Sequence, residues 1–253
     1  PRLFQPLKVG RLELSNRRVM PAMLTNFANP DGTVSERLKS YYVERARGGV
    51  GLIIVEITCV APGGKGSPTQ LGIYSDDFIP GLRDLARSVQ AQGARIALQL
   101  HHAGRQTRAA VEGRQPVAPS PIPCPLLRET PRELAAEEIE GLVEAFAQAA
   151  RRAQEAGFDA VEFHGAHGYL IAQFLSPYSN KRMDRYGGDR EGRMRFALRI
   201  LDRAKALVGP DFPILFRLSG DEFVEGGLTL DETRPIAQRL AGAGVHILHV
   251  SAG

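Results

Sequence analysis

Short apolar runs that alternate with longer amphipathic segments constrain this chain more than any other feature. The apolar runs cover residues 50–55, 96–98, 160–163, 214–216 and 247–250. A continuous run of this length is typical of a strand buried on both faces, and strands that alternate with helices form parallel sheets. The pattern predicts an α/β fold with a parallel sheet, either an open doubly wound sheet or a closed barrel.

Capping residues and glycines mark the ends of the other predicted elements. Ser35 is a typical helix N-cap, Asp231 is expected to cap a later helix, and Gly10 sits at the turn of an alternating apolar and polar stretch. We expect a hairpin at residues 7–14, a short strand at 18–20, and helices at about 35–46, 79–92, 136–156, up to 208, and 231–242.

The residues at the predicted strand ends favour the barrel. No Gly-x-Gly-x-x-Gly motif follows the first strand, which weakens the dinucleotide-binding sheet. In a barrel of parallel strands, every strand delivers the residue at its carboxyl end to one shared site. The predicted strand ends carry Met23, Glu56, Gln99, His164 and Arg217. Polar side chains in these places are typical of the active site of a TIM (β/α)8 barrel.

Two imidazoles and a phenol lie within six positions after one predicted strand. His164 and His167 could both donate hydrogen bonds to one small oxygen atom, and Tyr169 offers a phenolic proton nearby. A core or helix-cap role is the simpler interpretation of a single histidine. A zinc site is less favoured, because no third ligand follows at suitable spacing and Cys59 and Cys124 lie far apart. We expect a proton-handling site without a metal.

Charge, cysteine content and hydropathy restrict the binding partners and the cellular compartment that we expect. The chain has 32 basic and 28 acidic residues, and the net charge of +4 is too small to argue for nucleic acid. The apolar runs are far shorter than the roughly 20 residues that a membrane span requires. Two cysteines without a framework pattern suggest a reducing compartment. We expect a cytoplasmic protein that binds neither nucleic acid nor a membrane.

Two long segments interrupt the alternation. The Pro-rich stretch 105–131, here called the excursion, is too long for an ordinary strand-to-helix loop and is a candidate lid or binding loop. The charged stretch 176–195, here called the insertion, is most simply a solvated, salt-bridged surface when judged by its charge alone.

Five motifs, in order along the chain, resemble the old yellow enzyme family. Within this family, the motifs most resemble the bacterial NADH:flavin oxidoreductase branch, which also includes the barrel portion of 2,4-dienoyl-CoA reductases. The motifs are Phe4–Gly10, Asn16–Met23, Gln99–Arg105, His164–Leu170 and Ser176–Gly188.

The resemblance implies an FMN-dependent ene-reductase built on a TIM barrel. NAD(P)H would reduce FMN, and flavin N5 would then pass hydride to the β carbon of an α,β-unsaturated carbonyl compound. His164 and His167 match the pair that holds the carbonyl oxygen of this small-molecule enone or enoyl substrate, and Tyr169 matches the proton donor. The matching flavin-binding residues are Pro21, Ala22, Met23 and Leu24 along the ring, Ile57 through its backbone, Gln99 at the pyrimidine edge, and Arg217 near N1 and O2.

Some positions depart from the family pattern. Leu24 replaces a Thr or Cys that tunes the flavin potential in many relatives, and Gly192 stands where the pattern usually has Asn, which predicts a looser helix start. The insertion matches a family signature through Asp184, Tyr186 and the two glycines that follow. Under the resemblance, we expect this insertion to frame the active site.

The length leaves the barrel apparently incomplete. We count about six strand and helix units in residues 1–253, and strands seven and eight, whose loops form the FMN phosphate site in the family, are not seen. We expect one FMN-binding barrel domain truncated on its carboxyl side, which would be a homo-oligomer if the barrel were complete. The alternatives are a flavin-free, non-catalytic barrel fragment, or the barrel part of a longer 2,4-dienoyl-CoA reductase-like enzyme. A phosphosugar isomerase or aldolase is less favoured, because no strand end carries a Schiff-base lysine.

Overall fold

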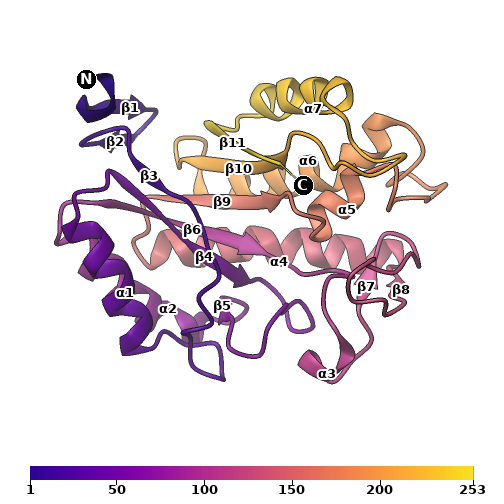
Figure 1. The fold of residues 1–253 in the computed structure, drawn as a ribbon, viewed down its shortest axis with the longest axis horizontal. Coiled ribbons are helices and arrows are strands. Elements are labelled where there is room, and N and C mark those ends of the chain that lie inside the picture. Colours follow the sequence, from indigo (N-terminus) through magenta and orange to yellow (C-terminus); the bar gives the residue numbers. More distant parts are fainter. Residues whose placement is uncertain (253) are drawn as a thin grey trace.

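A parallel sheet forms the centre of the molecule in the computed structural model, which describes residues 1–252 (Figure 1). Its six main strands follow one another in the order β11-β10-β9-β6-β4-β3, and the short β5 (Leu71–Gly72) pairs with the end of β4. The sheet curves as a half-barrel, which confirms the α/β, partial TIM-barrel fold. The main strands are β3 (Val19–Met20), β4 (Leu52–Cys59), β6 (Arg95–His101), β9 (Ala160–Gly165), β10 (Ile214–Ser219) and β11 (Ile247–Ser251).

The strands are longer than the apolar runs that predicted them. β4 continues through Glu56 to Cys59, with an irregular register between Val55 and Thr58, and β6 continues past Gln99 to His101. His164 and Arg217 likewise lie inside β9 and β10. The prediction that the strands end at these residues was wrong, because polar side chains on one face interrupt the apolar run while the backbone ladder continues.

Helices cover the outer face of the sheet. Outward-facing residues such as Val161 and Phe163 on β9 are fully buried against them, and the Phe163 ring meets Phe146 edge to face at 6.2 Å between centroids. Burial of a side chain of this size contributes about 2–3 kcal/mol. The helices are α1 (Glu36–Arg47), α2 (Ile79–Gln90), α4 (Ala136–Glu155), α5 (Leu170–Leu175), α6 (Arg190–Val208) and α7 (Leu230–Gly242).

The helix starts agree with the capping residues in one case and differ in another. The Ser35 side chain accepts a hydrogen bond from the Leu38 backbone N–H, so the predicted cap of α1 is confirmed. The cap of α7 is Thr229 rather than Asp231, which lies in the first helical turn. A carboxylate there still favours the helix, because it faces the positive end of the helix dipole.

The predicted hairpin closes the amino-terminal end of the half-barrel. It consists of β1 (Leu7–Val9) and β2 (Leu12–Leu14), paired antiparallel around Gly10, whose φ of 57° lies in the left-handed region. Leu12 and Leu14 are buried against the inner face of the sheet. The sheet residues in this inner apolar cluster are Leu52, Ile54, Ala97, Ala160 and Leu215. The lower half of the barrel interior is therefore an apolar core.

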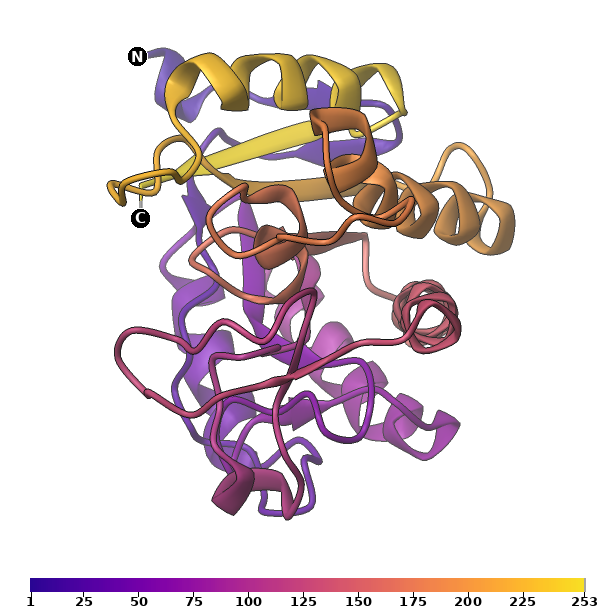
Figure 2. The same ribbon diagram turned by 90° about the vertical axis from the view of Figure 1, so that its right-hand side faces the viewer.

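The excursion and the insertion lie side by side over the carboxyl ends of the strands (Figure 2). The excursion contains α3 (Ala109–Glu112) and β7 (Val117–Ala118), which pairs with β8 (Arg132–Glu133) just beyond it. Arg182 of the insertion is buried, and its guanidinium donates to the carbonyl oxygens of Pro119 at 3.1 Å and Leu134 at 2.7 Å. The interpretation of the insertion as a solvated, salt-bridged surface holds for exposed residues such as Arg185, which pairs with Glu140. It was wrong for Arg182, because partners distant in sequence bury this cation.

Gly192 is required at the start of α6. The Asp189 side chain accepts a hydrogen bond from the Gly192 N–H at 2.8 Å, so the helix start is capped. A Cβ atom on residue 192 would clash with the Gly187 carbonyl oxygen. The expected loosening at this position is therefore wrong, since a larger residue would not fit beside Gly187.

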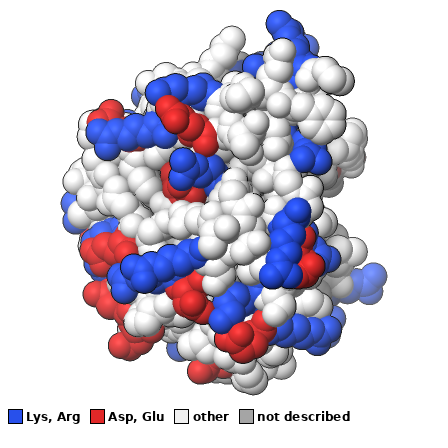
Figure 3. Space-filling model, turned by 90° about the vertical axis from the view of Figure 1, so that its left-hand side faces the viewer, with Lys and Arg blue, Asp and Glu red and all other residues white. Residues whose placement is uncertain are grey.

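Basic and acidic side chains are interspersed on the face that carries the hairpin (Figure 3). Some of them form exposed pairs, such as Lys8 with Glu13 at 2.6 Å and Arg11 with Asp211 at 2.7 Å. The small positive net charge is thus not gathered into one basic field on this face. None of the helices of residues 1–252 combines the length and the apolar character that a membrane crossing requires.

Candidate active site

Polar side chains gather on the inner face of the half-barrel, above the apolar floor. Side chains alternate along a strand, so Glu162 and His164 of β9 face inward while Val161 and Phe163 face the helices. The strand register aligns Gln99 with Glu162, and it aligns Arg217 with His164 on one side and His249 on the other. The parallel sheet therefore brings residues from four strands to one rim, as the barrel prediction required.

The three rings predicted to handle protons form one cluster. The ring centroids of His164 lie 5.1 Å from His167 and 4.9 Å from Tyr169. The Nδ1 atom of His164 accepts a hydrogen bond from the Ala166 N–H at 3.3 Å, so the proton of the neutral ring is on Nε2. Burial lowers the pKa of His164 well below its usual value, and the neighbouring His101 and His167 act in the same direction. The ring is a neutral hydrogen-bond donor at pH 7.

His167 occupies a backbone conformation that few residues adopt. Its φ is 57°, and its backbone N–H donates to the Ser219 hydroxyl at 3.0 Å, which holds the turn in place. Its Nε2 atom pairs with the Ser251 hydroxyl of β11 at 2.7 Å. Burial and the nearby Arg217 cation lower the pKa of His167 to about 4. In this conformation the Nδ1 atom is the ring nitrogen left for another partner.

Tyr169 lies directly before α5, at the end of the same turn. Burial raises the pKa of its hydroxyl, and a hydrogen bond from the Gln106 amide opposes the rise. The His101 ring contacts it edge to face, with 4.3 Å between the centroids. Tyr169 is therefore a protonated phenol whose ring is held by His101 and His164.

Gln99 and Arg217 leave buried hydrogen-bonding atoms without partners. Gln99 is fully buried, its Nε2 donates to Glu162 Oε1 at 2.7 Å, and its Oε1 has no partner. The Nη1 atom of Arg217 donates to the Ala22 carbonyl at 3.3 Å, whereas its Nε has no partner. A buried polar atom without a partner costs roughly 1–3 kcal/mol. One unused acceptor and one unused donor fit the polar pyrimidine edge of a flavin.

The remaining residues predicted at the flavin lie on the same rim. Pro21 and Ala22 follow β3, and the bond from Arg217 ties this segment to β10. Met23 and Leu24 come next and are exposed, at 50% and 40% of their surface. Ile57 is buried in β4, within the irregular register that interrupts its pairing with β6.

Glu56 anchors the chain that leaves β3. Its Oε2 accepts hydrogen bonds from the Thr25 backbone N–H at 3.0 Å and from the Thr25 hydroxyl at 2.6 Å. Burial raises the pKa of Glu56, and the bonds from Thr25 and Tyr42 oppose that rise. Glu56, which was predicted at a strand end facing the site, thus fixes the backbone beside Met23 and Leu24 through Thr25.

The prediction missed three inner-face residues, Glu162, His101 and His249. Each lies two positions from a predicted site residue or on the same register row, so the period of two along a strand could have found them. The Oε2 atom of Glu162 pairs with His249 Nδ1 at 2.9 Å. Among residues 1–252, no group of three or more His, Cys, Asp or Glu side chains is arranged to hold a metal ion.

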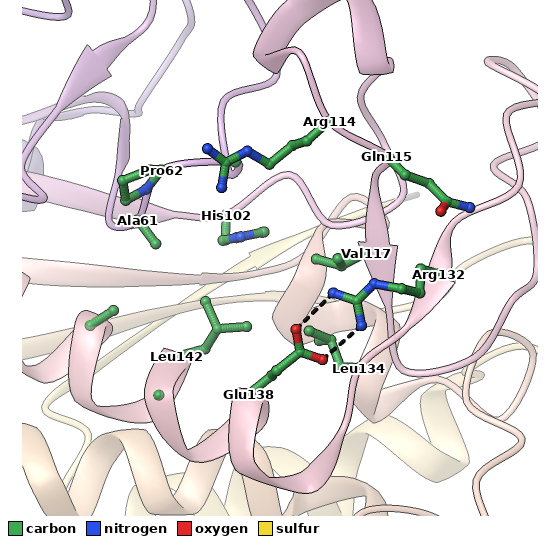
Figure 4. A pocket seen from close by; sticks show the side chains of 13 residues that line it. Ala61, Pro62, His102, Arg114, Gln115, Val117, Arg132, Leu134, Glu138 and Leu142 are labelled. Carbon is green, nitrogen blue, oxygen red and sulfur yellow. Dashed lines mark hydrogen bonds and ion pairs between the residues drawn. The ribbon is translucent and has the colours of Figure 1, made fainter.

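Two hollows lie near this region. One, of about 290 Å³, opens between the edge strands β3 and β11 and meets the site at Pro21 and His249. A groove of about 470 Å³ lies instead between α4 and the excursion (Figure 4). There Arg132 is neutralised by Glu138, with two nitrogen–oxygen contacts of 2.7 Å. The groove shares none of the inner-face residues, so the first hollow is the one that belongs to the site.

Comparisons with known proteins agree with this geometry. Residues 2–251 match the model of the NADH:flavin oxidoreductase / NADH oxidase family. The chain is 56% identical to an NADH oxidase of Thermoanaerobacter brockii, with all of this chain aligned to 39% of that protein. It is 44% identical to an NADPH dehydrogenase of a Geobacillus species, with 99% of this chain aligned to 73% of that protein.

A solved structure shows the same fold. Morphinone reductase in complex with tetrahydroNAD superposes with a TM-score of 0.89 at 35% identity, covering 99% of this chain and 73% of that one. The chain thus spans about 39% of the NADH oxidase and 73% of the shorter relatives. By the extent of these matches, the chain belongs to the NADH:flavin oxidoreductase / NADH oxidase family, which includes the old yellow enzymes.

Proposed function

We propose that this chain forms the flavin-binding and substrate-binding part of an FMN-dependent ene-reductase that uses NAD(P)H. One observation carries the proposal. The unpartnered Gln99 Oε1 and Arg217 Nε lie on the same inner face as the cluster of His164, His167 and Tyr169. Atoms suited to a flavin edge and rings suited to a carbonyl substrate therefore share one rim.

Gln99 and Arg217 would hold the pyrimidine edge, with Pro21, Ala22, Met23 and Leu24 along the ring and the Ile57 backbone beside it. When bound, FMN supplies the hydride that NAD(P)H has delivered to it. Arg217 remains a cation even though burial lowers its pKa, because guanidinium keeps its proton in proteins. A fixed positive charge here stabilises negative charge on the ring that it contacts.

The two histidines would bind the carbonyl oxygen of an α,β-unsaturated substrate. Neutral rings donate hydrogen bonds without adding charge, and the lowered pKa values keep both rings neutral at pH 7. His164 donates from Nε2. In the tautomer that carries its proton on Nδ1, His167 donates from Nδ1, and its Nε2 accepts a hydrogen bond from the Ser251 hydroxyl. Such donors stabilise the negative charge that develops on the oxygen as the double bond accepts hydride.

Tyr169 would supply the proton to the α carbon. The raised pKa keeps its hydroxyl protonated over the neutral pH range. Ring contacts from His101 and His164 fix the phenol, so the proton is held at one place beside the substrate. A positioned proton donor of this kind contributes roughly 100- to 10,000-fold to a rate.

The test replaces the hydroxyl and follows the two half-reactions separately. Tyr169→Phe should slow reduction of cyclohexenone by the reduced flavoprotein by roughly 100-fold or more, and leave flavin reduction by NAD(P)H unchanged within about threefold. Tyr74→Phe, which removes a hydroxyl next to Phe78, is the matched control and should change neither rate. Equal slowing of both half-reactions by Tyr169→Phe would contradict the assignment.

A barrel that holds no flavin is the second candidate, because the hollow between β3 and β11 is lined almost entirely by apolar side chains and offers few polar partners to a cofactor. An absorbance spectrum separates the two, because a chain that binds FMN is yellow and one that remains colourless after titration with FMN is not a flavoprotein. An anaerobic panel of enones, enoates and enoyl thioesters would then define the substrate class. We also propose a cytoplasmic setting, since Cys59 and Cys124 are free and buried, and a homo-oligomeric assembly for the complete barrel.

A further inference from the structure

We propose that Glu162 is a positioning residue that decides which end of the Gln99 amide faces the flavin. Glu162 is fully buried on the inner face of β9, in the same register row as Gln99 on β6. Neither the motif at His164 nor the proton-handling cluster uses it. The inference rests on the proposed flavin site and adds the residue that sets its polarity.

The chemistry of a carboxylate fixes the orientation of the amide. An ionised carboxylate can only accept hydrogen bonds, so the Gln99 NH₂ group must face Glu162, as the contact of 2.7 Å shows. The Gln99 carbonyl oxygen then points away from Glu162, and it is the atom left buried without a partner. Without the carboxylate, the amide could turn by 180° and offer NH₂ to the site instead.

His249 holds the carboxylate itself. Its Nδ1 atom lies 2.9 Å from Glu162 Oε2, and because the carboxylate only accepts, Nδ1 carries the proton. Oε1 of Glu162 therefore accepts from Gln99 on β6, and Oε2 accepts from His249 on β11. The Arg217 cation lies on β10, between the strands of Glu162 and His249. The negative charge of Glu162 raises the pKa of Arg217, whereas burial lowers it. The buried negative charge is thus compensated inside the cluster.

This orientation selects the ligand edge that Gln99 recognises. The pyrimidine edge of a flavin carries one N–H group, N3–H, between two carbonyl oxygens. A carbonyl oxygen on Gln99 accepts from N3–H, whereas a turned amide would prefer one of the flavin carbonyls. Glu162 thereby makes flavin binding depend on the N3–H group. It acts through the orientation of Gln99.

The test measures the affinity of the full chain for FMN and for N3-methyl-FMN by flavin fluorescence. Wild type should prefer FMN by about tenfold or more, the effect of one buried hydrogen bond. Glu162→Gln keeps the shape but can donate as well as accept, so Gln99 can turn and the preference should fall below about threefold. The matched control Glu140→Gln removes a carboxylate from outer helix α4 and should keep the wild-type preference. An unchanged preference in Glu162→Gln overturns the proposal.

A second measurement needs no flavin and reads the orientation of Gln99 in the wild-type chain. In the wild-type chain, one Gln99 side-chain N–H proton should resonate downfield of other glutamine amides and exchange slowly with water, with Gln99→Met used for assignment. An ordinary, fast-exchanging signal overturns the positioning role even if the flavin site is real. A chain that binds neither flavin but shows the held amide proton contradicts the proposed function and leaves the orientation by Glu162 supported.

Discussion

Gln173 joins the loop after β6 to the turn that carries Tyr169. Its fully buried amide donates from Nε2 to the carbonyl oxygens of Ala103 at 3.1 Å and Gly168 at 2.7 Å. Its Oε1 accepts from the Arg105 N–H at 3.2 Å. One side chain thus satisfies three backbone groups from two segments that lie about 65 residues apart in the chain.

We predict that Gln173→Met destabilises the fold by about 3–6 kcal/mol. Methionine fills a similar volume, so the cavity contribution is small, and the loss comes from three backbone groups left without partners at roughly 1–2 kcal/mol each. For a chain of 253 residues, this corresponds to a fall in melting temperature of about 10 °C. Urea unfolding followed by circular dichroism measures the free energy directly.

The matched control for this prediction is Gln148→Met. Gln148 lies on α4 and bonds only to the neighbouring side chains of Glu144 and Arg151, so its replacement should cost less than about 0.5 kcal/mol. The reasoning is refuted if Gln173→Met loses less than about 1 kcal/mol, the worth of a single ordinary hydrogen bond. Such a result would mean that the three backbone groups find other partners or water.

Two further predictions concern stability. Gly192→Ala should destabilise the chain, because the added Cβ would clash with the Gly187 carbonyl oxygen. Gly141→Ala, in open space on α4, should stabilise the chain by about 0.5–1 kcal/mol. Thermal unfolding of both variants should therefore show shifts of opposite sign. His167 has a folded pKa of about 4, below its unfolded value near 6.5. Its protonation therefore favours the unfolded chain, and stability should fall as the pH drops from about 6.5 towards 4, with a shallower fall in His167→Gln when urea midpoints are compared across that range.

The order of strands and helices could be predicted from the sequence, because it depends on local patterns. Apolar runs, the Ser35 cap and the turn at Gly10 are each defined by residues within a few positions. The strand ends could not be predicted in this way. Glu56 and Gln99 interrupt the apolar pattern, yet both continue the ladder because the inner face of a barrel tolerates polar groups near its site.

The site residues that lie within one short motif could be predicted from the sequence. His164, His167 and Tyr169 lie within one short stretch, and the structure shows their rings in contact. Glu162 was missed because its burial depends on Gln99, 63 residues before it, and on His249, 87 residues after it. The period of two along β9 places Glu162 on the same face as His164, but no nearby residue indicates which partners it meets.

Arg182 couples the two long loops at the rim. Its guanidinium reaches from the insertion to the carbonyl oxygens of Pro119, inside the excursion, and Leu134, just beyond it. If either loop moved outward alone, Arg182 would lose both carbonyl acceptors and keep the carboxylate of Asp184, which lies in the same loop. The Lys181 N–H also donates to the Ser120 hydroxyl of the excursion, at 2.9 Å. We therefore expect the two loops to move as one unit, so that opening this rim displaces both of them.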